Sequence, residues 1–168
     1  MSLDGREMNE INPYAPPEAA VVDIGAQAPA LWNPGAATAW CLLFTPAFGA
    51  ILQMKNWHAL GEPARAARSR AWAIGTAVFT VLVAIAGIAL PISLAVDRAL
   101  NLSSFVLLLV WYFADGREQV VFVKARFGAG YPRRRWMAPL LIGLAVLLAF
   151  SLLAMAALFV VMRARGEL

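Results

Sequence analysis

The chain has almost none of the side chains from which disulfides and metal sites are built. It holds one cysteine, Cys41, and one histidine, His58, in 168 residues. A single cysteine cannot close an intramolecular disulfide, and a histidine without cysteine neighbours cannot form the usual zinc site. His58 and Glu62 stand four residues apart and resemble half of a metal or acid–base site, but the second half is missing. We therefore expect no metal and no cofactor.

Charged residues are also scarce. They make up 14% of the chain and hydrophobic residues 61%, whereas a soluble domain holds about 25% and about 45–50%. The apolar residues gather in four runs, at about residues 36–54, 71–92, 99–115 and 137–162. Their lengths suit membrane-spanning helices, which need about 20 residues. Acidic and basic side chains are absent from the interiors of these runs, which argues against a pump or a proton-coupled transporter.

The four runs predict an all-α fold, a polytopic membrane helical bundle with four transmembrane helices over residues 36–162. Residues 1–35 hold five acidic residues and five prolines and predict a disordered, acidic tail. Residues 163–168 form a short C-terminal tail. Within the segment between the last two runs, residues 118–127 are expected to form a surface helix.

The first run is the least regular of the four. It is short, and Pro46 lies in its middle. A proline removes one backbone hydrogen bond and bends or breaks a helix. A re-entrant hairpin is therefore the alternative to a full crossing by this run, and the choice decides which side of the membrane the N-terminus faces.

The two halves of the chain show a weak internal sequence similarity. Each half reads as helix, basic loop with glycine and proline, then helix, and Gln53 of the first half corresponds to Gln119 of the second. A duplication of this kind would give two parallel helical hairpins. The alternative is that any basic loop beside a membrane collects such residues independently.

Basic residues are confined to a few loops. Residues 55–70 and 115–136 carry four and six Lys or Arg. The positive-inside rule predicts that both loops lie in the cytoplasm. Arginine outnumbers lysine twelve to two, a bias that suggests a bacterial genome rich in G and C, and we expect a bacterial inner membrane. The same charges suit anionic lipid headgroups rather than nucleic acid. The candidate lipid contacts are Arg133, Arg134, Arg135, Arg68 and Arg70.

Small residues recur at helical spacing in several runs. Ala37, Cys41, Thr45 and Gly49 are four residues apart and predict one continuous packing stripe on the first helix. The last run has a second stripe, formed by Ala138, Ala145, Ala149 and Ala156. We expect both stripes to lie where helices of the bundle meet.

Several short strings resemble those of known membrane proteins. Residues 12–17 read NPYAPP, residues 42–50 read LLFTPAFGA, and residues 123–128 read VKARFG. Together they resemble a group of small proteobacterial multi-pass inner-membrane proteins with an NPYAPP-type N-terminal tail. The resemblance implies a fold and a location, and it carries over neither an activity nor any functional residue.

Motifs that carry chemistry are not recognisable in the sequence. The glycine- and arginine-rich segment at residues 128–135 lacks the Lys-Ser/Thr of a phosphate-binding loop. We expect a protein without enzymatic activity that acts as an accessory or interaction subunit of a membrane complex. Its expected partners are membrane lipids and either another membrane protein or a second copy. The alternatives are an immunity-type protein that protects the membrane from a toxin, and a transporter of small solutes or lipids.

Overall fold

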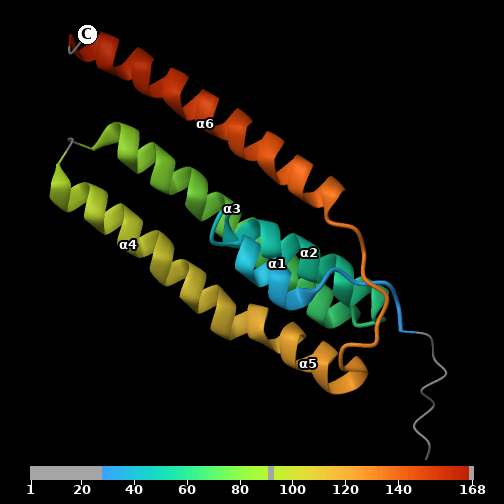
Figure 1. Ribbon diagram of the computed structural model, residues 1–168. Coiled ribbons are helices and arrows are strands. Elements are labelled where there is room, and N and C mark those ends of the chain that lie inside the picture. Colours follow the sequence, from blue (N-terminus) through green and yellow to red (C-terminus); the bar gives the residue numbers. More distant parts are fainter. Residues whose placement is uncertain (1–27, 91–92, 167–168) are drawn as a thin grey trace, which may run out of the picture.

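The computed structural model describes residues 28–90 and 93–166, and within them the fold is all-helical apart from one isolated β-bridge. Figure 1 shows the helices arranged as one elongated bundle. In chain order they are α1 (Pro34–Trp40), α2 (Pro46–Ala59), α3 (Pro63–Ala89), α4 (Leu94–Trp111), the π-helix η1 (Tyr112–Gly116), α5 (Arg117–Phe127) and α6 (Met137–Arg165). The predicted all-α class is confirmed for the described residues.

Among the described residues, three helical segments are long and apolar enough to cross a membrane. They are α3, the continuous segment Leu94–Phe127 made of α4, η1 and α5, and α6, with 27, 34 and 29 residues. At 1.5 Å per residue even the shortest measures about 40 Å, more than the roughly 30 Å of a hydrocarbon core. They correspond to the second, third and fourth expected spans, and their helices extend well into the segments expected to be loops.

The prediction of a single transmembrane helix over residues 36–54 was wrong. Two shorter helices, α1 of 7 residues and α2 of 14, occupy this region, separated by a turn at residues 41–45. Pro46 is the reason. A proline disfavours helical geometry in the residue before it, and Thr45 is extended, with φ −173° and ψ 164°. Pro46 then takes the first helical position of α2, where a missing N–H costs nothing.

These two helices form a hairpin that enters and leaves at one end of the bundle (Figure 1). The segment before α1 pairs with the connection between α5 and α6, through Leu31 N to Pro132 O at 3.0 Å and Arg134 N to Leu31 O at 2.9 Å. Asn56, near the end of α2, bonds the backbone of Trp32 on the same segment. The backbone therefore has the hairpin shape that the re-entrant alternative expected, and Leu42 and Leu43 at the hairpin tip are exposed.

The expected basic loop at residues 55–70 is largely helical, which the sequence did not predict, and the segment at residues 115–136 begins with a helix. Within residues 55–70 only a short turn separates α2 from α3, and Gly61 there has φ +74°, a left-handed value that favours glycine after a helix end. Helix α5 matches the expected surface helix at residues 118–127, but it continues α4 instead of lying separately. Both segments still meet at one end of the bundle, called the basic end below.

The buried core lies at the basic end and not in the middle of the spans. The fully buried side chains include Trp57, Trp111 and Leu31, all from this region. Helix α6 has no buried residue at all. Its stripe of Ala138, Ala145, Ala149 and Ala156 is exposed, so the expectation that this stripe packs within the bundle was wrong. The half-buried residues of α6 are on the opposite face, where leucine, phenylalanine and proline side chains approach α2 and α3.

The hairpin predicts a specific labelling pattern. In a Cys41→Ala background, we expect Ala30→Cys and Gly130→Cys to react with an impermeant maleimide from the same side of sealed vesicles. Ser93→Cys, at the start of α4, should react from the opposite side, because one crossing of α3 separates it from the basic end. Labelling of Ala30→Cys together with Ser93→Cys would mean that residues 36–54 cross the membrane.

Candidate functional site

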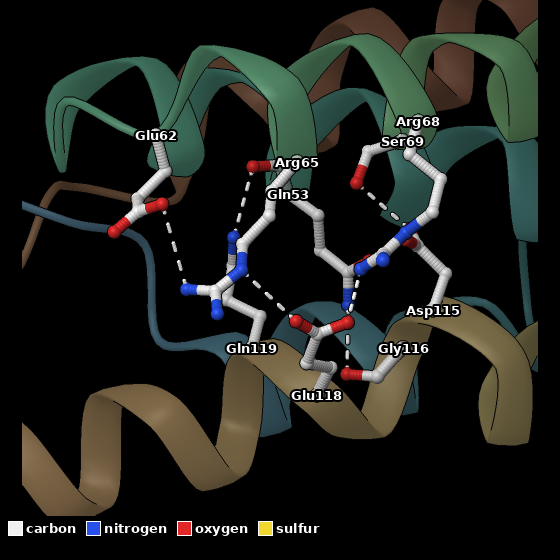
Figure 2. A network of polar contacts seen from close by, with 9 residues as sticks. All are labelled: Gln53, Glu62, Arg65, Arg68, Ser69, Asp115, Gly116, Glu118 and Gln119. Carbon is white, nitrogen blue, oxygen red and sulfur yellow. Dashed lines mark hydrogen bonds and ion pairs between the residues drawn. The ribbon is translucent and has the colours of Figure 1, made fainter.

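Five polar side chains are buried together at the basic end, where α2, α3, η1 and α5 meet, and Figure 2 shows all of them except Asn56. They form the polar cluster: Gln53, Asn56, Ser69, Asp115 and Gln119, each at most 1% exposed. Burying so many polar groups is costly unless they bond one another. The cluster is therefore the most demanding feature of the fold and the first place to look for a function.

Helical periodicity brings these residues together. On α3 the buried residues are Ala66, Ser69, Ala73 and Thr76, at spacings of three and four, so one narrow face of small residues looks inward. On the segment Leu94–Phe127 the π-helix η1 inserts one extra residue into a helical turn. This insertion changes which residues of the helix face the interior of the bundle. As a result the neighbours Asp115 and Gly116 are both buried.

Asp115 is bonded through both carboxylate oxygens. Arg68 Nε donates to Oδ1 at 2.8 Å, and Ser69 Oγ donates to Oδ2 at 2.7 Å. Arg68 also pairs with Glu118, which in turn pairs with Arg65 Nε at 3.0 Å. Charges of opposite sign thus alternate from Asp115 outward toward solvent. This arrangement neutralises a buried carboxylate and clamps α3 against η1 and α5.

A chain of amide groups joins α2 to the other side of the cluster. Gln53 Nε2 donates to the backbone oxygen of Gly116 at 3.0 Å, and Gln119 Nε2 donates to the backbone oxygen of Gln53 at 2.9 Å. Asn56 Nδ2 donates to Gln119 Oε1 at 3.0 Å and to Trp32 O at 2.8 Å, while Trp32 N donates to Asn56 Oδ1 at 3.1 Å. Asn56 therefore connects the segment before α1 to both α2 and α5.

Asn56→Ala should release that segment. Two hydrogen bonds to the Trp32 backbone disappear, and each contributes about 1 kcal/mol. We expect amide hydrogen exchange in residues 28–35 to speed up by about tenfold or more. Asn101→Ala is the matched control, because Asn101 is exposed and bonds only its own helix at Asp97. Equal exchange in the two variants would mean that Asn56 does not hold the segment.

The five arginines predicted to contact lipid lie in three places. Arg68 belongs to the ion-pair network, with its side chain 43% exposed. Arg70 is exposed on α3, outside the cluster. Arg133, Arg134 and Arg135 follow one another on the connection before α6. There Arg134 Nε donates to Ala30 O at 2.8 Å, and Trp32 Nε1 donates to Arg135 O at 3.1 Å.

The stripe of small residues is interrupted but still marks a close contact. The break at residues 41–45 separates Ala37 and Cys41 from Gly49, so the continuous stripe was wrong. Ala37, Cys41 and Gly49 are nevertheless buried, and Thr45 is half-buried. A Cβ placed on Gly49 would overlap Cys41 Sγ and lie 2.8 Å from Trp111 Cη2. Gly49 is thus where α2 touches both the hairpin turn and α4.

The polar cluster holds helices together through side chains that are already paired. Both oxygens of Asp115 already accept hydrogen bonds, and Glu62 pairs with Arg65, not with His58, which is exposed. Within residues 28–90 and 93–166, no three His, Cys, Asp or Glu side chains gather as a metal site would require. What the arrangement does chemically is satisfy buried charge and fix the angle between α2, α3 and α5.

Sequence reasoning did not anticipate this cluster. Asn56 and Ser69 were not singled out, and Asp115 was interpreted only as the first residue of the basic loop at residues 115–136. One signal was present in the sequence: the weak internal similarity aligned Gln53 with Gln119, and in the structure a hydrogen bond joins these two residues.

Comparison with known proteins adds no further guide. No protein-family model, no curated protein and no solved structure matches this chain.

Proposed function

We propose that this chain is an integral protein of a bacterial inner membrane that acts without enzymatic chemistry, as an accessory or interaction subunit of a larger membrane complex. The observation that carries the proposal is the outward face of α6. This helix is the most apolar of the three spans, with a mean hydropathy of 2.8, and no residue of it is buried.

The outward face of α6 has the residues that helix pairing in lipid requires. Ala145 and Ala149 are four residues apart, and Ala138 and Ala156 extend the same line by seven residues at each end. All four are exposed. In a membrane, helices associate through close backbone approach at small residues, because lipid supplies no hydrophobic driving force. A partner helix placed on this line would contact the backbone of α6 over about 27 Å.

The rest of the molecule suits a scaffold for that face. The polar cluster and the ion pairs around Asp115 fix α2, α3 and α5 at the basic end. Helix α6, in contrast, has few contacts with the bundle, most of them with α3, and Arg165 Nη2 reaches Ala89 O at 3.0 Å near its far end. A rigid base with one loosely packed span is what an attachment subunit needs, since the span can adjust to its partner.

The proposed orientation follows from the charges. With the basic end in the cytoplasm, α3 and the segment Leu94–Phe127 cross outward and back, and α6 crosses outward again. The re-entrant hairpin then keeps residue 28 on the cytoplasmic side, and the end of α6 faces outward. We further propose that the chain belongs with the small proteobacterial proteins that carry an NPYAPP-type tail.

The test is purification of the tagged full chain from its own membranes in a mild detergent, followed by identification of proteins recovered in stoichiometric amount. We expect one integral membrane partner. Ala145→Leu with Ala149→Leu should abolish its recovery, because two large side chains prevent close approach. Ala157→Leu is the control, since Ala157 is also exposed but lies off this line. Recovery of the chain alone, or only with copies of itself, would overturn the proposal.

A further inference from the structure

A hollow in the described part of the chain lies on the inner side of α6. It is a groove of about 430 Å³ between α2, α3 and α6. Its walls are apolar, with Phe44, Phe48, Ile142, Val146 and Phe150 among them. The size falls within the range of about 300–1,000 Å³ typical of sites for small ligands. On α6 the groove lies beside the alanine line discussed above: Ala138 belongs to both, whereas Ala145, Ala149 and Ala156 do not line the groove.

The groove is elongated and has a chemically distinct mouth. Along α6 its lining runs from Ala138 to Phe150, which is about 18 Å of helix. The Ala138 end lies at the basic end, and there Trp32 and Lys55 join the lining. Lys55 is the one charged residue among the residues that line the groove. The opposite end is formed by side chains from the middle of the spans.

Trp32 brings a second cation to the mouth. Lys55 Nζ lies 5.9 Å from the centre of the Trp32 ring, and the Arg134 guanidinium carbon lies 4.6 Å from it. The ring is fixed by the bond from its Nε1 to Arg135 O. Tryptophan and basic residues together are typical of the headgroup level of a membrane. The mouth is therefore positively charged and lies where lipid phosphates are found.

We propose that this groove binds one acyl chain of an anionic phospholipid, with the lipid phosphate held between Lys55 and Arg134. Hydrocarbon fits the walls because they are mainly apolar; of the two threonines that line them, Thr80 donates its hydroxyl to Thr76 O in its own helix. An extended peptide would bury amide groups that these walls cannot satisfy. The cationic mouth supplies the preference for an anionic headgroup, worth about fivefold in affinity for each cation.

The headgroup is tested in nanodiscs that contain phosphatidylglycerol and phosphatidylcholine. Native mass spectrometry of the full chain should show one tightly retained phosphatidylglycerol. Lys55→Gln should lower its affinity about fivefold, and glycerol phosphate without acyl chains should not compete. Lys124→Gln, the other lysine of the chain, is the matched control because it lies on α5 away from the groove. Equal retention of both lipids, or equal effects of the two lysine variants, would overturn the proposal.

The acyl chain is tested by filling the groove. Ala77 is an exposed residue of α3 that lines the groove, so Ala77→Leu places bulk in the channel without disturbing the buried face. The retained lipid should be lost, whereas Ala71→Leu, on another face of α3, should keep it. A phosphatidylglycerol with a photoreactive acyl chain should label Ile142, Val146 or Phe150 in the unaltered protein, which tests the idea even if a variant fails to fold. Labelling only outside these residues, or cross-linking of a protein there instead, would contradict it.

Discussion

Asp115→Ala is expected to lower the free energy of unfolding by about 3 kcal/mol. The carboxylate is fully buried and accepts one bond from Arg68 and one from Ser69. A hydrogen bond to a charged group contributes about 1.5–3 kcal/mol. The expected loss corresponds to two such bonds at the lower end of this range, because the Arg68 side chain is 43% exposed and keeps Glu118 as a partner. The measurement is reversible unfolding of the purified protein in mixed detergent micelles, followed by circular dichroism.

Asp97→Ala is the matched control for this prediction. Asp97 is exposed in the first turn of α4 and accepts one bond from Asn101 at 3.1 Å. Its loss should cost less than about 1 kcal/mol, the usual size of a helix-dipole or surface contribution. Asp115→Asn tests the charge alone, because asparagine has nearly the same shape and still accepts a hydrogen bond from Ser69, but it cannot form the ion pair with Arg68. Equal effects of the two alanine variants would show that the buried carboxylate does not hold α3 to η1.

The long helices could be predicted because their physics is local. An apolar run of sufficient length, without charges, crosses a membrane whatever its neighbours are. This is why α3, α4 and α6 lie where hydropathy placed them. Their ends were less accurate. Residues 55–70 were predicted as a loop and residues 118–127 as a separate surface helix. In the structure α3 already begins at Pro63 and α5 continues α4, and Arg65 and Arg68 of α3 pair with Glu118 of α5.

The hairpin required information that a local pattern does not contain. Pro46 indicated a bend and left both a crossing and a re-entrant turn open. The difference is decided by contacts between distant residues, such as Trp32 with Asn56 and Leu31 with Pro132 and Arg134. The same holds for Arg68, which composition alone assigned to lipid. Its acidic partners are 47 and 50 residues away in the chain, at Asp115 and Glu118.

The distribution of burial connects the fold to the proposed function. Specific, costly interactions are concentrated at the basic end, whereas the spans bury little against one another. A membrane protein that worked alone would be expected to pack its spans more fully, because exposed small-residue faces gain nothing from lipid. The two sides of α6 therefore suit different neighbours: a partner helix at the alanine line, and a lipid acyl chain in the groove.

Gly49→Ala is expected to destabilise the fold by about 2 kcal/mol, although alanine normally favours a helix. The added Cβ would overlap Cys41 Sγ and lie 2.8 Å from Trp111 Cη2, closer than atoms in a packed core approach. Both neighbours are buried, so neither can move away freely. Overpacking of this kind costs about 1–3 kcal/mol. The unfolding measurement described for Asp115 applies here, with thermal stability as a second readout.

Two further variants identify the cause of that loss. Gly75→Ala is the control within a long helix, because a Cβ there meets nothing within 4 Å, and alanine should leave stability unchanged or raise it by up to about 1 kcal/mol. Cys41→Ala combined with Gly49→Ala removes the sulfur but leaves the approach to Trp111. The double variant should therefore recover part of the loss and be more stable than the sum of the single effects predicts. If Gly49→Ala is as harmless as Gly75→Ala, the hairpin does not pack against α4 at this point, and the close contact that closes the membrane end of the core is not formed.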